Sequence, residues 1–318
     1  MMDLRHMRHL VAVAEELHFG RAAQRLNMAQ PPLSQSIKRL EDYLGVQLLE
    51  RSRSGVSLTS AGKVFFDEAK RTLMQADLTR AVTLRASQSS TSQVHVSFIG
   101  PALFRVLPPV LLRHRKAYPN VHIRLSQVSS PNQMVGVMKG QYDVAFVHPS
   151  VDLPEGGDQF LVERCRFVAA IPADWPLAKQ SSVTLRELGA MPLVMAPQAE
   201  APDRVSEQLA AFRDVGVSPH IAQEAMQTHT SLSLVAAGMG CALHMETAAL
   251  TGMRGVAFRP IDDLPTNVRW ETAMVWHPHH LSPVARNFVM GVKAFVAENP
   301  ELVSGGDVTH DHIQKISN

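Results

Sequence analysis

Two short amphipathic segments near the start of the chain restrict its fold more than any other feature. Arg21 to Leu26 contains small alanines that allow close packing, and a turn over 27–30 leads into Pro31-Pro32. Proline is tolerated in the first turn of a helix, because its missing N–H would have no acceptor there. The apolar residues that follow repeat at helical spacing opposite a polar, basic face: Leu33, Ile37, Leu40 and Leu44. The pattern predicts a helix-turn-helix.

Further elements are predicted on both sides of this motif. Apolar residues from Leu4 to Leu17 indicate a preceding helix that ends near His18, with Gly20 permitting the turn. Short strands at 46–50 and 56–58 flank Arg51–Gly55, which has the composition of a hairpin tip and so predicts a wing. Thr59 or Ser60 can cap a helix that continues over about six turns. Such a long helix is expected to bury its apolar stripe against a second subunit, with packing on its own domain as the alternative.

A polar stretch from Ser87 to Gln93 is the clearest linker in the sequence. Beyond it, strand patterns alternate with helical patterns, beginning with a strand at 94–99 and a helix at 107–117. This alternation predicts an α/β fold with a parallel sheet. The expected organisation is a winged helix-turn-helix at 2–60, a linker and dimerisation helix at 61–86, a hinge at 87–93, an α/β domain at 94–302 and a flexible tail at 303–318.

The net charge of +2 hides an uneven distribution of charge along the 318 residues. Residues 1–90 hold 13 Lys and Arg against 9 Asp and Glu, whereas the rest of the chain holds 18 against 20. Between Arg21 and Lys63 the balance is 7 against 3. Because a basic excess attracts polyanions, we expect an anion-binding surface in this segment, with ordinary charge scatter as the alternative.

Composition excludes several classes of protein. Two cysteines, Cys165 and Cys241, are too few for a disulfide framework, and the charged start of the chain does not resemble a secretory signal. The apolar runs are far shorter than the ~20 residues of a membrane-spanning helix. We therefore expect a cytoplasmic protein without a membrane partner. Phosphate-binding loops, nucleophile elbows and paired-carboxylate motifs are absent from the sequence, so no enzyme activity is expected.

An ordered series of motifs connects the amino-terminal part with a known family: Asp3–His6, Val11–Phe19, Arg21–Ala23, Gln30–Ser34, Leu40–Glu41 and Leu58–Gly62. Through them, residues 2 to about 67 resemble the DNA-binding domain of LysR-type transcriptional regulators. The remainder more loosely resembles the effector-binding domain of that family, through Leu107-Pro108, Tyr118-Pro119, Gly140, Asp143–Ala145 and Leu234–Gly240. The resemblance implies a two-lobed α/β domain like those of periplasmic binding proteins. It extends to the subgroup that senses aromatic-catabolism metabolites.

The resemblance implies that Pro31–Glu41 lies in the major groove with its first residues at base edges. The amides of Gln30 and Gln35 suit adenine, and Lys38 suits a phosphate. Gln35 stands where family members often carry arginine, so the preferred operator is expected to differ at that base. The wing arginines would reach the minor groove or backbone. The expected DNA-binding residues are Arg21, Gln30, Pro31, Pro32, Ser34, Gln35, Lys38, Arg39, Arg51 and Arg53.

The resemblance also implies an effector cleft between lobe I, at about 94–158 and 266–302, and lobe II, at about 159–265. The chain is expected to cross between the lobes near 152–159 and to return near 258–270. The expected cleft residues are Gly100, Pro101, Ala102, Ser129, Ser130, Val147, His148, Pro197, Gln198, Gln227 and Thr228. Helix amino termini in the cleft favour an anionic effector. Pro101 weakens the case for a carboxylate, because many members have a hydroxyl residue there and proline cannot donate.

The function implied by the resemblance is a sequence-specific transcriptional activator controlled by a small molecule. Its expected partners are double-stranded DNA, an unidentified effector, further copies of itself in a homodimer or homotetramer, and RNA polymerase. No cofactor or metal is expected, because His277–His280 and His310–His312 lack companions at ligand spacing. The rival hypotheses are an enzyme or solute-binding protein that uses the two-lobed domain, and a repressor that works without an effector.

Overall fold

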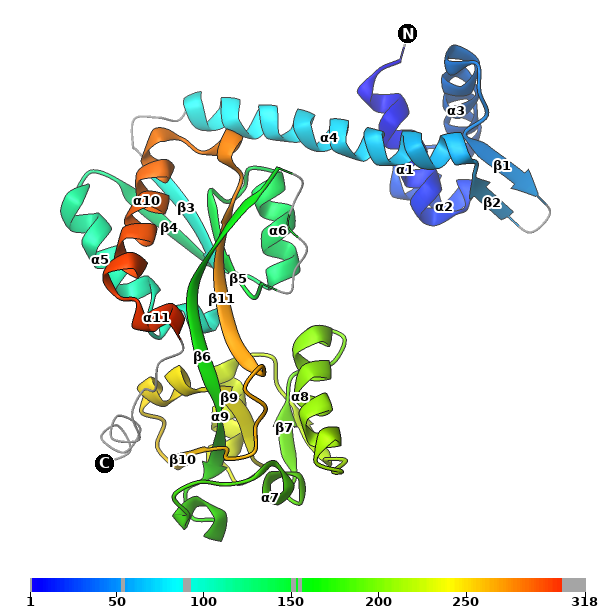
Figure 1. Cartoon of the computed structure of the whole chain (residues 1–318). Coiled ribbons are helices and arrows are strands. Elements are labelled where there is room, and N and C mark those ends of the chain that lie inside the picture. Colours follow the sequence, from blue (N-terminus) through cyan, green and yellow to red (C-terminus); the bar gives the residue numbers. More distant parts are fainter. Residues whose placement is uncertain (1, 53–54, 88–92, 150–152, 154–155, 305–318) are drawn as a thin grey trace. The chain divides into compact units, whose positions relative to one another are not determined.

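The structure is a computed structural model, and it describes residues 2–52, 55–87, 93–149, 153 and 156–304 (Figure 1). The chain divides into two compact units: the first comprises 1–89 together with the short segment 138–140, and the second comprises 90–137 and 141–318. Each unit has a hydrophobic core of its own. Among the described residues, no helix combines the length and the apolar character needed to span a membrane.

The first unit begins with three helices: α1 (Leu4–Glu16), α2 (Phe19–Arg25) and α3 (Gln30–Leu44). Asp3 caps α1, because its carboxylate accepts the backbone N–H groups of Arg5 and His6 at 2.9 and 3.1 Å. The helices share one core, formed by Leu10, Val13, Phe19, Ala22, Ala23, Leu33, Ile37 and Leu40. The predicted apolar stripe of α3 is therefore the buried one, and the predicted helix-turn-helix is confirmed.

The turn between α1 and α2 differs from the expected one. Leu17 adopts the left-handed conformation, with φ of 49°, and donates its N–H to the carbonyl of Val13. His18 then caps α2 through Nδ1, which accepts the N–H of Gly20 at 3.0 Å. Gly20 lies inside α2, and a Cβ there would stand 2.9 Å from the His18 ring. The glycine thus makes room for a capping side chain instead of forming the turn.

The wing consists of β1 (Leu49–Ser52) and β2 (Gly55–Leu58), which pair antiparallel from Leu49↔Leu58 to Ser52↔Gly55. β1 begins later than the expected 46–50. Gly45, with φ of 70°, ends α3, and the residues that follow are hydrogen-bonded to Glu41 before the strand begins. The carboxylate of Glu41 accepts the N–H groups of Leu48 and Leu49 at 2.8 and 3.1 Å. The backbone of Arg51 lies in β1, but its side chain and the whole of Arg53 lie outside the described residues.

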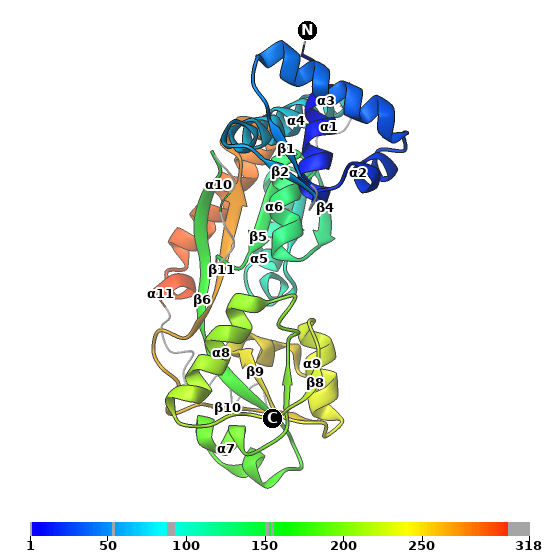
Figure 2. The same ribbon diagram turned by 90° about the vertical axis from the view of Figure 1, so that its right-hand side faces the viewer.

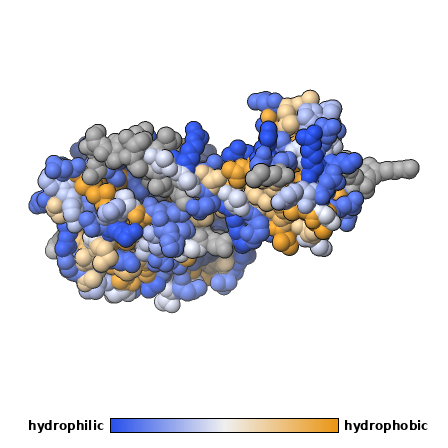
Figure 3. All heavy atoms as spheres, turned by 90° about the horizontal axis from the view of Figure 1, so that it is seen from above, coloured by the Kyte–Doolittle hydropathy of each residue, from blue (hydrophilic) through white to orange (hydrophobic). Residues whose placement is uncertain are grey.

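The long helix α4 (Ser60–Ser87) begins at Thr59, whose hydroxyl accepts the N–H of Gly62 at 2.9 Å. Its first turns pack against α1, with Ala69 fully buried. Val64 is 66% exposed, so α4 also presents apolar surface outside the core of its own unit. The space-filling view shows orange hydrophobic residues at the surface among blue hydrophilic ones (Figure 3).

The second unit is built on a sheet with the strand order β10-β6-β11-β5-β3-β4, and β9 also pairs with β6. A separate pair, β7 and β8, is parallel. The strands are β3 (Gln93–Phe98), β4 (His122–Gln127), β5 (Val144–Val147), β6 (Asp158–Pro172), β7 (Leu193–Met195), β8 (Ile221–Glu224), β9 (Ala242–Met245), β10 (Val256–Pro260) and β11 (Arg269–Trp276). The helices are α5 (Leu107–Ala117), α6 (Ser130–Met138), α7 (Leu185–Gly189), α8 (Pro202–Asp214), α9 (Thr228–Ala236), α10 (Pro283–Glu298) and α11 (Glu301–Ser304).

Two long antiparallel strands correct the expectation of a purely parallel sheet. β3, β4 and β5 are parallel, but β6 and β11 pair antiparallel with each other and run through both lobes (Figures 1 and 2). Along β6, Val162 belongs to the core of lobe I and Cys165 to the core of lobe II. The chain therefore passes from one lobe to the other inside these two strands, later than the expected crossings at 152–159 and 258–270. A register shift between Thr272 and Ala273 marks this change.

Helices cover both faces of the sheet in lobe I. α5 and α10 contribute to the core that includes Phe98 and Phe288, and α6 contributes to a smaller cluster around Val137. The chain after α10 differs from the expected tail, because Val303 and Ser304 belong to α11, whose Leu302 is buried. Residues 305–318 of that predicted tail, and residues 88–92 of the predicted hinge, lie outside the described residues.

Candidate functional site

The outer face of α3 presents a polar stripe opposite its buried leucines. Pro31, Gln35, Lys38 and Asp42 follow one another at steps of four, three and four residues, and all four are exposed. Of the other predicted DNA-binding residues in α3, Gln30, Pro32 and Arg39 are exposed and Ser34 is half-buried. Asp42 limits the basic part of the stripe to the first three turns of α3.

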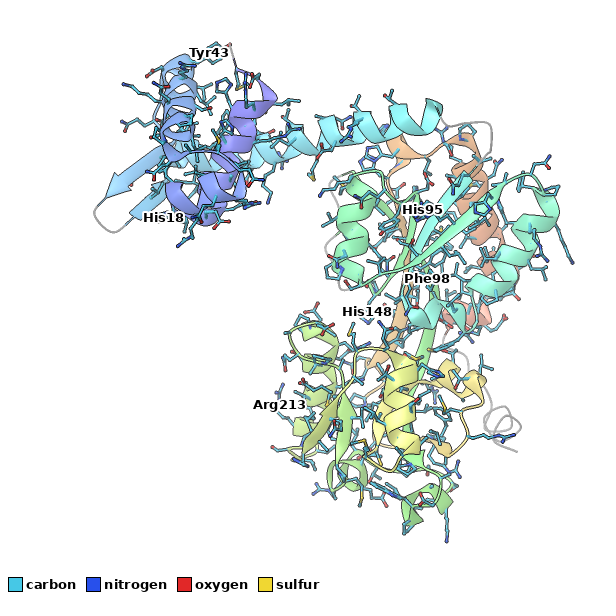
Figure 4. All side chains as sticks on the ribbon, turned by 180° about the vertical axis from the view of Figure 1, so that it is seen from behind. His18, Tyr43, His95, Phe98, His148 and Arg213 are labelled. Carbon is cyan, nitrogen blue, oxygen red and sulfur yellow. The ribbon has the colours of Figure 1, made fainter. Side chains whose placement is uncertain are left out.

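The core holds this surface in place from behind. Leu33, Ile37 and Leu40 are almost completely buried, and the hydroxyl of Ser36 lies 2.7 Å from Nδ1 of His9 on α1. Tyr43, near the other end of α3, is 59% exposed (Figure 4). A helix fixed on one side and open on the other can enter a groove without rearrangement of the unit.

The basic residues of the first unit fall into two groups. Lys38 and Arg39 form no ion pair with any carboxylate that the structure describes, so their charges are available to a phosphate. Arg21 instead lies 3.5 Å from the carboxylate of Glu16 and donates to the Glu16 carbonyl. Arg25 binds Glu15 at 2.7 Å, and this hydrogen bond raises the pKa of Arg25. A phosphate would therefore compete with Glu16 for Arg21.

A cleft of about 410 Å³ lies between the two lobes of the second unit. The structure brings together in its lining these predicted residues: Gly100, Pro101, Ser129, Ser130, His148, Gln227 and Thr228. It does not place Ala102, Val147, Pro197 or Gln198 there. Ala102 and Val147 are buried in the cores of lobe I, which explains their absence from the cleft surface. Figure 4 shows His148 where the two lobes face each other.

The fully buried side chain of Gln133 holds the lobe I wall together. Its amide nitrogen donates to the carbonyls of Val128 and Phe146 at 2.9 and 3.1 Å, and its oxygen accepts the hydroxyl hydrogen of Ser97. These partners lie at the ends of β3 and β5 and in the loop after β4. Gln133 was not predicted, because the sequence around a glutamine in a helix does not indicate whether its side chain is buried or exposed.

The lobe II wall begins further along the chain than expected. After β7, the carbonyl of Pro197 accepts the N–H groups of Glu200 and Ala201, both at 3.1 Å, and so closes a turn. This turn carries the chain past Gln198, which bonds to Ser206, and brings 200–204 to the cleft. Pro202 begins α8, three residues before the expected start at 205. Proline at the first helical position was the signal that could have placed Arg204 in the first turn.

Arg204 packs over an aromatic pair that also lines the cleft. Its guanidinium carbon lies 5.6 Å from the ring centre of Trp270, and the ring of His148 meets Trp270 edge-on at 5.3 Å. Burial lowers the pKa of Arg204. Burial, followed by the charge of Arg204, also lowers the pKa of His148. His148 is therefore neutral near pH 7, and Arg204 is the charged member of this group.

One hydrogen bond spans the cleft from lobe to lobe. The amide nitrogen of Gln127, at the end of β4, donates to the side-chain oxygen of Gln227 at 2.8 Å. Gln227 precedes α9, yet its side chain does not cap that helix. A Cβ on Gly100 would lie 3.3 Å from the Gln127 nitrogen, so a glycine leaves room for this bridge.

Neither cysteine is placed for reaction, and no metal cluster is found in the described part of the chain. Cys165 and Cys241 are fully buried, and burial raises the pKa of both thiols, that of Cys241 to about 12. Among the described residues, no group of three His, Cys, Asp or Glu side chains is arranged to hold a metal ion. His310–His312 lie outside the described residues.

A winged helix-turn-helix with an open recognition helix, linked in one chain to a two-lobed ligand cleft, defines a DNA-binding regulator that responds to a small molecule. Comparison with known proteins supports this class. Residues 4–63 match the bacterial regulatory helix-turn-helix protein of the lysR family, and residues 87–295 match the LysR substrate binding domain. The chain belongs to the LysR family of transcriptional regulators, as the sequence motifs indicated.

Individual relatives agree with this assignment. The chain is 33% identical over 291 residues to the transcriptional regulator AlsR of Bacillus subtilis, which covers 91% of the chain and 94% of AlsR. It is 32% identical over 264 residues to the regulator BenM of Acinetobacter baylyi, covering 82% of the chain and 86% of BenM. The crystal structure of CbnR with its target DNA matches with a TM-score of 0.54 at 25% identity, covering 92% of the chain and 99% of CbnR.

The relatives also decide between the rival functional classes. They are transcriptional regulators, so the hypothesis of an enzyme built on the two-lobed domain is wrong. The protein is a LysR-type regulator with a DNA-binding unit and an effector-binding unit.

Proposed function

We propose that this regulator activates transcription when a small molecule occupies the cleft between lobes I and II. The observation that carries the proposal is the open face of α3, with amide and unpaired basic side chains, in a chain whose other unit contains a cleft of about 410 Å³. Cavities of roughly 300 to 1,000 Å³ are typical of small-molecule sites. A repressor that works without an effector does not require such a cleft.

The proposed DNA contacts come from the exposed stripe of α3 and from the wing. Gln30, Ser34 and Gln35 would read base edges, since amides and hydroxyls can do so in the major groove. Lys38 and Arg39 would bind phosphates, which position the helix. Arg21, Pro31, Pro32, Arg51 and Arg53 complete the proposed surface.

A dimer or tetramer is part of the proposal. The apolar surface of α4 supports it, because Val64 is exposed on a helix whose first turns already pack on α1. Two copies of a helix-turn-helix would bind an interrupted palindrome whose symmetry matches that of the protein. Activation would involve contact with RNA polymerase, and a protein that acts on DNA would work in the cytoplasm.

The proposed effector contacts combine Gly100, Pro101, Ser129, Ser130 and His148 from lobe I with Gln227 and Thr228 from lobe II. Trp270, Arg204 and Gln127 join them, because they also line the cleft. The bridge from Gln127 to Gln227 supports a role of the effector in setting the spacing of the lobes.

A mobility-shift assay tests the DNA-binding part of the proposal. The full chain should retard DNA from upstream of its own gene, and a variant that lacks residues 1–66 should not. Failure of the full chain to shift that DNA would overturn the proposed function.

The response to an effector needs a separate measurement. A thermal-shift screen against a library of metabolites should find at least one compound that stabilises the second unit. If no compound does so while the DNA shift is retained, the effector-independent repressor becomes the better description.

A further inference from the structure

Among the described residues that line the cleft, Arg204 is the only Lys or Arg, and its position is unusual for a cation. It is half-buried in the first turn of α8, with the face of Trp270 beneath it. Behind Arg204 lies only a water-sized space of about 20 Å³, which shares Arg204, Met226, Thr228 and Trp270 with the cleft. The space behind Arg204 is too small for an organic ligand, so a ligand that binds the guanidinium would lie in the cleft.

The hydrogen-bonding groups of Arg204 are poorly satisfied within the described residues. A guanidinium has five N–H donors, yet the acceptor found for Arg204 is the sulfur of Met226 at 3.8 Å, a weak acceptor. No carboxylate in the described ranges forms an ion pair with it. Burial of a cation without a counter-ion is unfavourable, so binding of an anion next to Arg204 would lower the free energy of the site.

We propose that the effector is a small organic monoanion, and that Arg204 binds its carboxylate. This inference rests on the proposed function, because it assigns a ligand class to the same cleft. The guanidinium can hold a carboxylate through two parallel N–H···O hydrogen bonds. Arg204 thereby supplies from lobe II the anion-binding group that Pro101 cannot supply from lobe I.

The rest of the lining defines the body and the charge of the ligand. Apolar side chains from both lobes line the cleft: Ile99, Pro101, Val128, Pro131, Ala201, Pro202 and Met226. Glu200 and Asp203 also belong to the lining, but both are exposed to solvent. A second negative charge would find no further Lys or Arg in the described lining and would be repelled by these carboxylates, whereas Arg204 compensates the first charge. A monoanion with an apolar body fits this distribution better than a dianion or a phosphate.

Trp270 and His148 position the guanidinium. The face of Trp270 supports the guanidinium plane, and the His148 ring meets Trp270 from another side. Because the pKa of His148 is lowered, that ring is neutral near pH 7 and adds no second positive charge. Recognition of the anion therefore depends on Arg204.

Calorimetry on the full-length protein with matched pairs of probes tests the inference. The probes are butyrate, hexanoate and cyclohexanecarboxylate, each compared with its primary amide, which has nearly the same shape but no charge. We expect at least one acid to bind about 10-fold to 100-fold more tightly than its amide, which is the range for a charged hydrogen-bonded pair. Equal binding of acids and amides, or no binding of any acid at 10 mM, would overturn the inference.

Two variants separate ligand recognition from a merely structural role. Arg204→Gln should reduce the ratio of acid to amide affinity to about one, whereas loss of stability alone would weaken both probes equally. Arg213→Gln is the matched control, because Arg213 is exposed near the other end of α8 (Figure 4). It should leave the ratio unchanged. An unchanged ratio in Arg204→Gln would show that another group binds the anion.

DNA binding in the same preparations distinguishes this inference from the function on which it rests. Wild type and Arg204→Gln should retard upstream DNA equally when no acid is present. If wild type retards DNA but no acid binds, only the ligand class is wrong. If wild type does not retard DNA, the proposed function fails whatever binds in the cleft.

Discussion

The recognition helix and the effector cleft place their chemistry in opposite ways. In α3, residues that face outward alternate along 15 residues with residues that form the core. The cleft instead collects residues from several separate segments, and some of them, such as Trp270, are also buried in a core. On α3, different residues therefore serve binding and stability, whereas in the cleft some of the same residues serve both.

The prediction with the largest expected effect tests whether the two units unfold independently. In Gly62→Ala the new Cβ would lie 1.9 Å from the carbonyl oxygen of Leu48, a backbone atom that cannot move aside easily. We expect a loss of about 3 kcal/mol in the free energy of unfolding of the first unit, together with loss of DNA binding. Circular dichroism melts and mobility shifts measure these effects.

Fluorescence supplies the control for Gly62→Ala, because Trp175, Trp270 and Trp276 all lie in the second unit. Their unfolding transition should not change. Gly291→Ala is a matched substitution at a helical glycine whose added Cβ meets no atom within 4 Å, and it should not destabilise the protein. A shifted fluorescence transition in Gly62→Ala would show that the units do not unfold independently.

The second prediction tests whether binding can change on α3 without loss of stability. Gln35 is exposed and lies opposite the buried stripe, so Gln35→Ala should leave the melting temperature unchanged. Removal of a base contact should weaken binding to the specific operator by about 1 to 3 kcal/mol, which is roughly 5-fold to 150-fold. Titrations on operator and scrambled DNA measure this difference. An equal loss on both DNAs would contradict the role of Gln35 as a base contact.

The third prediction concerns a histidine beneath the cleft. His244 is buried and hydrogen-bonded to the Ser231 hydroxyl at 2.9 Å, and burial, with the charge of Arg204, lowers its pKa to about 3. The unfolded chain takes up a proton near pH 6.5, whereas the folded chain does not until about pH 3. Stability should therefore fall as the pH falls through this range, by about 2 kcal/mol between pH 7 and 5 from this residue.

Denaturant titrations followed by tryptophan fluorescence at pH 7 and 5 measure that loss. His244→Gln cannot take up a proton, so the difference between the two pH values should shrink by about 2 kcal/mol, whatever the stability of the variant at pH 7. Other histidines with lowered pKa values, His148 and His280 among them, still contribute to the pH dependence of the free energy of unfolding in this variant. An unchanged pH difference in His244→Gln would refute this assignment.

The smallest expected effect concerns the attachment of the wing to α3. Glu41→Ala removes the acceptor of the Leu48 and Leu49 N–H groups and should destabilise the first unit by about 1 kcal/mol. Glu41→Gln keeps an oxygen at the same place and should be milder. Melts of the first unit by circular dichroism rank the two variants, and equal losses would mean that the carbonyl-type acceptor at this position is unimportant.

Local patterns predicted the first unit well and the second unit only in part. The apolar stripe of α3 and the two prolines placed that helix, because both signals act within a few residues. Local patterns did not predict the pairing of β6 with β11. Antiparallel pairing between 158–172 and 269–276 joins segments about 100 residues apart, so neighbouring residues do not indicate it. Arg204 was missed for a related reason: the turn closed by the Pro197 carbonyl decides which part of the loop after β7 reaches the cleft.

The sequence by itself determined the helix-turn-helix, the exposed polar face of α3 and the membership of a regulator family, because each depends on the identity and spacing of neighbouring residues. The tertiary structure alone decided that Gln127 meets Gln227, 100 residues away, and that Arg204 lies over Trp270 without a described counter-ion. Such contacts depend on how the lobes fold around the crossing strands. The basic excess of the first 90 residues favours contact with DNA, whereas a single arginine in the nearly neutral remainder sets the proposed charge of the effector.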